Sequence, residues 1–217
     1  MQSHYDFPIN GKELPSKYDY NHAMRWLEIK GKEQYGKQFK LHPEDAHLIR
    51  RLLCYFLSDE YSAAELNINL DKGILLTGPI GVGKSSLMNL MRLFEPPSMR
   101  CIMKSCRDVS FEFIQHGYQI IHKYSRQSFH QFEPVTYCFD DLGTENNLKY
   151  FGNECNVMGE ILLSRYDLFV SRNLTTHLTT NLSASEIEAA YGNRIRSRMR
   201  ELFNLVAFDK TVKDKRV

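Results

Sequence analysis

The fold is decided by the stretch Gly78-Pro79-Ile80-Gly81-Val82-Gly83-Lys84-Ser85-Ser86, which fits the pattern GxxxxGK[ST] of a phosphate-binding loop. An apolar run, residues 73–77, precedes it, and a helical pattern, residues 85–94, follows it. In such a loop the backbone N–H groups face phosphates, the lysine reaches the β- and γ-phosphates, and the Ser85 hydroxyl binds Mg²⁺. A glycine-rich turn that only joins a strand to a helix is the alternative. The full motif predicts binding of a nucleoside triphosphate, with Lys84 exposed in the loop.

The segments beyond this loop are predicted to alternate between strands and helices. Strands are expected at residues 73–77, 100–105, 135–139, 174–180 and 204–208. Helices are expected at residues 42–56, 85–94, 111–124, 157–166, 185–191 and 193–203. This alternation predicts an α/β fold in which helices cover both faces of a parallel sheet. Residues 42–217 are predicted to form this core.

Residues 1–41 are predicted to form an N-terminal arm that packs on the core or binds a partner. The segment is polar and rich in aromatic residues, and only residues 21–30 have helical spacing. We expect Gly31 and Gly36 to end this helix, because glycine is a poor helix former.

Composition limits the classes of protein to consider. The 217 residues are 42% hydrophobic and 25% charged, which is typical of one globular domain. The net charge of +2 is too small to predict or to exclude nucleic-acid binding. No secretory signal or membrane-spanning run is recognised. The five cysteines are scattered, which predicts reduced thiols, no metal centre of cysteines and a cytoplasmic location.

A second acidic element follows the strand expected at residues 135–139. Asp140 is predicted to hold Mg²⁺ and Asp141 to orient or polarise the attacking water. The alternative is that both acids only end a buried strand before the turn at Gly143. Beside a phosphate-binding loop, the functional interpretation is favoured.

A polar residue also follows the strand expected at residues 174–180. Asn181 is predicted to contact the γ-phosphate or the nucleophilic water, because its strand is expected beside the strand of the loop. The alternative is that Asn181 caps the next helix or sits in a turn.

Four arginines lie within seven residues near the end of the chain: Arg194, Arg196, Arg198 and Arg200. One of them is able to reach the γ-phosphate of a neighbouring subunit as an arginine finger. A solvated basic helix face, or contacts with a nucleic-acid backbone, would explain the same residues.

Taken in this order, these elements resemble the AAA+ ATPases, and most of all the DnaC/IstB-like group of helicase loaders and transposition helper proteins. The resemblance rests on residues 78–86, 137–143, 161–166, 179–183 and 192–201. It implies a P-loop NTPase fold of the AAA+ type without a C-terminal helical lid. It also implies that Asp140-Asp141 is the Walker B pair, that Asn181 is sensor 1 and that Arg198 is the arginine finger.

The resemblance implies an ATPase that uses ATP and Mg²⁺, assembles into oligomers on DNA, and serves a replicative helicase or a transposase. The region after residue 110 carries an aromatic and basic mixture suited to single-stranded DNA, although an ordinary amphipathic helix fits the same residues. These residues are His116, Tyr118, His122, Lys123, Tyr124, Arg126, Phe129 and His130. A small-molecule P-loop kinase and a nucleotide-gated scaffold with negligible turnover are the alternative functions.

Overall fold

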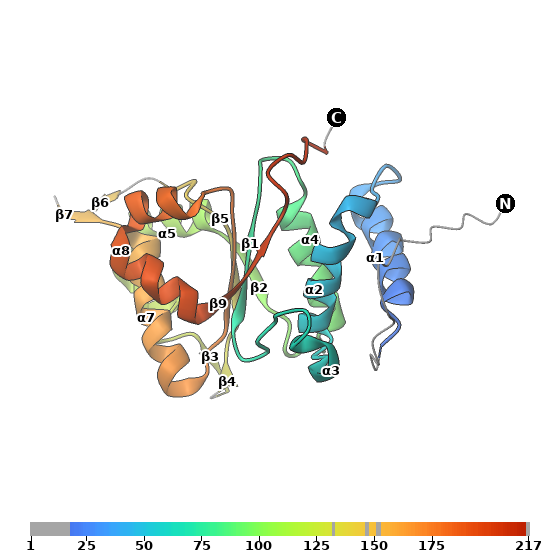
Figure 1. Ribbon diagram of the computed structural model, residues 1–217. Coiled ribbons are helices and arrows are strands. Elements are labelled where there is room, and N and C mark those ends of the chain that lie inside the picture. Colours follow the sequence, from blue (N-terminus) through green and yellow to red (C-terminus); the bar gives the residue numbers. More distant parts are fainter. Residues whose placement is uncertain (1–17, 132, 146–147, 151–152, 216–217) are drawn as a thin grey trace. The chain divides into compact units, whose positions relative to one another are not determined.

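The computed structural model describes residues 18–131, 133–145, 148–150 and 153–215 (Figure 1). The chain divides into two compact units. The first consists of Met1–Leu70 and Leu90–Glu95, and the second of Asp71–Asn89 and Pro96–Val217. The part of the predicted N-terminal arm before Tyr18 lies outside the described residues.

The described part of the first unit is helical. Its elements are α1 (Tyr20–Tyr35), a 3-10 turn (Pro43–Asp45), α2 (Ala46–Phe56), α3 (Glu60–Ala63) and a second 3-10 turn (Arg92–Phe94). The buried carboxylate of Asp59 ties α1 to α3, because it accepts hydrogen bonds from the Tyr20 hydroxyl (2.6 Å) and the Ser62 hydroxyl (2.8 Å).

Helix α1 is longer than the sequence predicts. It continues through Gly31 to Tyr35, and Gly36, with φ of +100°, follows its last turn. The Phe39 ring explains the glycine within the helix, because a Cβ atom on Gly31 would lie 2.1 Å from a carbon of that ring. Gly31 therefore does not end the helix, and its missing side chain leaves room for the Phe39 ring against the helix backbone.

The second unit contains a five-stranded parallel sheet, as predicted (Figure 1). Its strands are β1 (Gly73–Thr77), β2 (Ile102–Ser105), β5 (Tyr137–Leu142), β8 (Thr176–Thr180) and β9 (Phe203–Ala207). Their order across the sheet is β2-β5-β8-β1-β9, and every pairing is parallel. Because parallel strands all end at the same edge, the loops after β1, β5 and β8 meet there.

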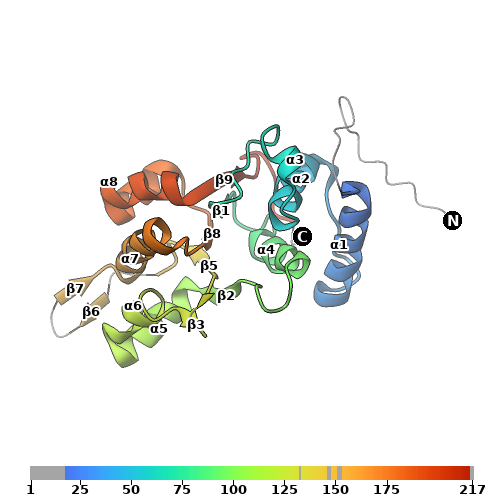
Figure 2. The same ribbon diagram turned by 90° about the horizontal axis from the view of Figure 1, so that it is seen from below.

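Helices cover both faces of this sheet, as predicted (Figure 2). On one face lie α5 (Cys106–His116), α7 (Val157–Arg172) and α8 (Ala184–Leu202), which bury side chains such as Phe113, Ile161 and Met199 against the strands. The start of α4 (Lys84–Met91) leaves β1 on the opposite face. The described residues between β9 and Lys215 form no helix.

The helix expected at residues 111–124 is two helices in the structure. Helix α5 starts at Cys106, because the Ser105 side chain caps it by accepting the Asp108 N–H. It ends at Gly117, whose φ of +61° interrupts the helical backbone, and α6 (Gln119–Lys123) follows. Two small two-stranded sheets were not predicted from the sequence. These are β3 (Phe129–His130) with β4 (Glu133–Pro134), and β6 (Leu148–Tyr150) with β7 (Asn153–Cys155).

Arg165 on α7 is a fully buried cation that joins separate segments of the second unit. Its guanidinium donates to the Thr176 hydroxyl (2.7 Å) and to the carbonyl oxygens of Tyr124 (2.8 Å) and Thr175 (2.8 Å), among others. Burial lowers its pKa to about 9, so it stays charged at neutral pH. These bonds stabilise the charge where few water molecules reach it.

Candidate nucleotide-binding site

The predicted phosphate-binding loop joins β1 to α4, as the motif requires. Gly81 and Gly83 have φ of +82° and +91°, a region that residues with a side chain rarely adopt. Val82 is buried and Ile80 is exposed. Ser85 and Ser86 lie in the first turn of α4, where backbone N–H groups lack helical partners and favour an anion.

Lys84 is not exposed as we expected from the sequence. Its side chain is buried, and its ammonium donates to the carbonyl oxygens of Gly78 (2.9 Å) and Pro79 (2.8 Å). The physical reason is that the glycine-rich loop curls around the lysine and presents its carbonyl oxygens to the ammonium. The lysine therefore stabilises the curled loop as well as supplying a positive charge.

The segment after β9 lies on this loop. The Lys215 N–H donates to the Gly81 carbonyl oxygen (3.1 Å). A Cβ atom on Gly81 would lie 2.1 Å from the Asp214 carboxyl carbon, and one on Gly78 would lie 2.6 Å from Phe208 Cβ. Both glycines thus allow the end of the chain to approach the loop backbone closely.

The two predicted acids lie in the last three residues of β5, which runs to Leu142 and not only to Phe139. Both side chains are half-buried. Asp141 has φ of +56°, in the left-handed region. A carboxylate at Asp140 and a hydroxyl at Ser85 are the hard oxygen ligands that Mg²⁺ takes beside phosphates and water, so the residues present fit this ion.

A third acid, Glu145, was missed by the sequence analysis. Its carboxylate accepts the Gly143 N–H (2.9 Å) and a short hydrogen bond from the Tyr191 hydroxyl. Burial raises the pKa of the Cys106 thiol well above its usual value, and the negative charges of Glu145, Asp140 and Asp141 raise it further. Glu145 follows the acid pair and the turn at Gly143, and no motif in the sequence marks it as a candidate.

Asn181 directly follows β8, which lies beside β1 as predicted and is paired with β5 on its other side. Its side chain is exposed. The alternative that Asn181 caps the next helix is wrong. Ser183 is the N-cap of α8, and it forms a capping box with Glu186. Asn181 is thus left at the edge of the sheet where the loops after β1 and β5 also end.

Arg198 lies on α8 and packs against α7. Its described contacts do not include the phosphate-binding loop. Its guanidinium lies 4.3 Å from the centre of the Tyr166 ring. It donates to the Tyr166 hydroxyl (2.9 Å) and to the Glu201 carboxylate (3.2 Å). The kink at Gly192 separates this half of α8 from the first half. Arg194 is exposed, whereas Arg196 forms a short ion pair with Glu188.

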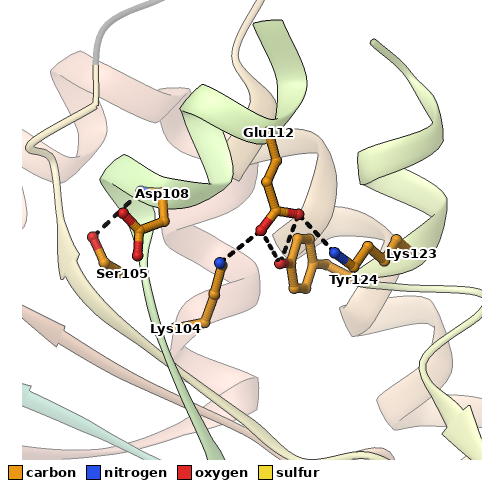
Figure 3. Close-up of polar contacts among 6 residues, drawn as sticks. All are labelled: Lys104, Ser105, Asp108, Glu112, Lys123 and Tyr124. Atoms are coloured by element: carbon orange, nitrogen blue, oxygen red, sulfur yellow. Dashed lines mark hydrogen bonds and ion pairs between the residues drawn. The ribbon is translucent and has the colours of Figure 1, made fainter. Parts of the chain in front are cut away.

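Two residues of the aromatic and basic region, Lys123 and Tyr124, bind a side chain of the same protein and not a ligand (Figure 3). Glu112 on α5 binds Lys104 (2.6 Å), Lys123 (2.7 Å) and the Tyr124 hydroxyl (2.9 Å). Tyr124 is buried, so it is not available to stack on a base. Tyr118 and Arg126 remain exposed.

We expect the hydrogen bonds and ion pairs of the Glu112 carboxylate to stabilise the fold only above an acidic pH. Burial would raise the pKa of Glu112, but hydrogen bonds from Lys104, Lys123 and Tyr124 outweigh it and lower the pKa from 4.5 to about 2. Because the folded-state pKa is depressed, the stabilisation is present above about pH 4.5 and disappears as the pH falls toward 2. Melting temperatures measured across this range should converge for wild type and Glu112→Gln at low pH. The exposed Glu65→Gln should follow wild type throughout, and an unchanged gap for Glu112→Gln would contradict the expectation.

Comparison with solved structures identifies the class of fold. The chain is similar to DnaI, with a TM-score of 0.54 and 20% sequence identity over 79% of this chain and 88% of that one. It is similar to domain III of the Thermotoga maritima replication initiation protein DnaA, with a TM-score of 0.53 and 12% identity over 83% and 68% of the two chains. It is also similar to a DNA replication initiation factor, with a TM-score of 0.50 and 16% identity over 79% of this chain and 48% of that one.

These similarities confirm the predicted α/β P-loop NTPase fold. At this level of identity they establish the fold alone. No protein-family model and no curated protein matches the sequence.

The described part of the chain lacks two further features. None of its helices has the length and apolar character required to cross a bilayer. No group of three His, Cys, Asp or Glu side chains is placed to hold a metal ion there. All five cysteines are buried, and none of them forms a disulfide bond.

Proposed function

We propose that this protein binds ATP and hydrolyses it with Mg²⁺. The observation that carries the proposal is the convergence of three segments at one edge of the sheet. The phosphate-binding loop follows β1, Asp140 and Asp141 end β5, and Asn181 follows β8, which lies between those two strands. ATP hydrolysis needs a phosphate cradle, a metal ligand and a polarised water, and these residue types supply all three.

Each residue has a separate task in this proposal. The N–H groups of residues 78–86 and the Lys84 ammonium bind the phosphates, while Ser85 and Asp140 hold Mg²⁺. Bound Mg²⁺ neutralises the charge that develops on the phosphates. Asp141 orients and polarises the attacking water, and Asn181 contacts that water or the γ-phosphate.

We further propose that the protein works in DNA replication or in the movement of mobile elements. Helicase loading or transposition help fits the resemblance of its motifs, and the solved structures of similar fold include replication initiation proteins. Such a role requires assembly into oligomers on DNA and a helicase or transposase as partner. Two exposed aromatic rings, Phe111 on α5 and Tyr118 just before α6, offer surfaces on which single-stranded bases are able to stack.

A kinase for small molecules and a nucleotide-gated scaffold are the competing functions. A kinase would need an acceptor pocket and an arginine-rich lid, and the strand that ends at Asn181 fits it poorly. The Asp140-Asp141 pair argues against a scaffold with negligible turnover. Sedimentation with and without ATP and single-stranded DNA separates our proposal from both competing functions. Assembly that requires both ATP and DNA supports our proposal, whereas a monomer under all conditions contradicts the oligomeric role.

The primary test is the affinity of Lys84→Ala for MgATP. Loss of a charge-assisted hydrogen bond to phosphate, worth about 1.5–3 kcal/mol, should weaken binding about 10- to 150-fold. Because Lys84 also bonds two loop carbonyl oxygens, the melting temperature must be measured in parallel. Lys210→Ala removes an exposed lysine and serves as the control. Affinity of a folded Lys84→Ala within a few-fold of wild type would refute the assignment of the loop.

A further inference from the structure

One buried hydroxyl connects both acids of the candidate site. Thr179 is the fourth residue of β8, and its side chain is fully buried. Its Oγ1 donates to Asp140 Oδ1 (2.6 Å) and accepts the backbone N–H of Asp141 (2.9 Å). The same atom therefore orients the carboxylate of one acid and the backbone of the other.

The pairing of β5 with β8 shows why this hydroxyl is needed. Phe139 pairs with Leu178 and Leu142 pairs with Thr180, so two residues of β5, Asp140 and Asp141, lie opposite Thr179 alone. Such a bulge interrupts the ladder of backbone hydrogen bonds and redirects side chains. It also gives Asp141 its φ of +56°, in the left-handed region that residues with a side chain seldom adopt. The Thr179 hydroxyl accepts the Asp141 N–H in place of a backbone carbonyl oxygen of the ladder.

The neighbouring Thr180 provides the contrast. Its hydroxyl is also fully buried, but it donates to the Leu142 carbonyl oxygen (2.7 Å) and accepts the Leu182 N–H (3.1 Å). Those partners are backbone groups outside the acid pair. Consecutive threonines on one strand thus have hydroxyls of equal burial, and only that of Thr179 bonds the acids.

We propose that Thr179 is a positioning residue that holds Asp140 for Mg²⁺ and Asp141 for the attacking water. The inference rests on the proposed ATPase function and adds to it a residue that neither touches the nucleotide nor belongs to the predicted site. The hydroxyl fixes the Asp140 carboxylate in one orientation and maintains the bulge that sets the direction of Asp141. A residue that supports a metal ligand in this way typically changes metal affinity or activity about 10- to 100-fold when it is replaced.

The experiment compares three variants of the full chain: Thr179→Val, Thr179→Ser and Thr180→Val. For each we would measure the Mg²⁺ concentration that half-saturates binding of a fluorescent non-hydrolysable ATP analogue, the single-turnover rate of ATP hydrolysis, and the melting temperature. Thr179→Val should need about 10-fold more Mg²⁺ and hydrolyse ATP about 10- to 100-fold more slowly, while its affinity for the analogue without Mg²⁺ stays that of wild type. Thr179→Ser keeps the hydroxyl and should resemble wild type. Thr180→Val should lose stability as Thr179→Val does, yet keep the Mg²⁺ requirement and the rate.

Each other outcome has a defined meaning. Wild-type values in Thr179→Val, equal losses in Thr180→Val, or no recovery in Thr179→Ser would overturn the positioning role. If valine prevents folding, Thr179→Ala compared with Thr180→Ala makes the same test. A wild-type chain that binds the Mg²⁺-nucleotide without hydrolysing it would refute the ATPase proposal, and the Mg²⁺ requirement would still decide the role of Thr179. A wild-type chain that binds no nucleotide would overturn both.

Discussion

Asp141→Asn is expected to bind MgATP as wild type does and to hydrolyse it about 10²- to 10⁴-fold more slowly. The amide keeps the shape of the carboxylate but cannot take a proton from water or polarise it. Asparagine also tolerates the left-handed backbone of this position, where φ is +56°. The N–H that donates to the Thr179 hydroxyl is unchanged, so the fold should be preserved. Equilibrium binding and single-turnover hydrolysis measure the two effects separately.

Glu145→Gln is the matched comparison for this variant. Glu145 is held by the Gly143 N–H and the Tyr191 hydroxyl, and its loss should reduce stability more than the rate. If Glu145→Gln abolishes hydrolysis and Asp141→Asn does not, the polarising acid is Glu145. If both variants keep the wild-type rate, neither carboxylate polarises the water.

The parts of the fold that depend on local pattern were predictable from the sequence. Strand β1 was found at its predicted residues, because an apolar run bounded by a polar segment and a glycine loop is a local signal. The division of residues 111–124 into two helices was not predicted, since it depends on the backbone that Gly117 adopts. The extension of α1 through Gly31 depends on Phe39, which is eight residues away in the sequence.

The candidate site also has a part that was predictable from the sequence and a part that was not. Its motifs are contiguous, so their residues and their order were visible in the sequence. The contacts of these residues were not, because they join distant positions. The Thr179 hydroxyl bonds Asp140 across 39 residues, and Lys123 binds Glu112 across a helix break. The burial of Lys84 depends on how the loop closes around it, which the spacing of the glycines does not specify.

Arg198→Ala should lose about 10³- to 10⁵-fold of DNA-stimulated ATP hydrolysis and still bind ATP as a monomer. An arginine finger stabilises charge on the phosphoryl group of the nucleotide that the neighbouring subunit binds. It is therefore not needed for ATP binding within its own subunit. Stacking on Tyr166 and bonding to Glu201 hold the side chain in one orientation. Both described hydrogen bonds use Nη1, so Nη2 and Nε are not engaged in them. A held guanidinium loses less side-chain entropy when it meets a phosphate.

Mixing Arg198→Ala with Lys84→Ala tests whether the arginine acts between subunits. An intact loop from the first variant should meet an intact arginine from the second, and part of the activity should return. Arg194→Ala is the comparison, because Arg194 lies one helical turn earlier and is exposed. If Arg194→Ala shows the loss and the rescue instead, it is the arginine finger, and the bonds of Arg198 to Tyr166 and Glu201 only join α8 to α7. No rescue at any mixing ratio, with both variants folded and assembling, would mean that Arg198 acts within its own subunit or binds DNA.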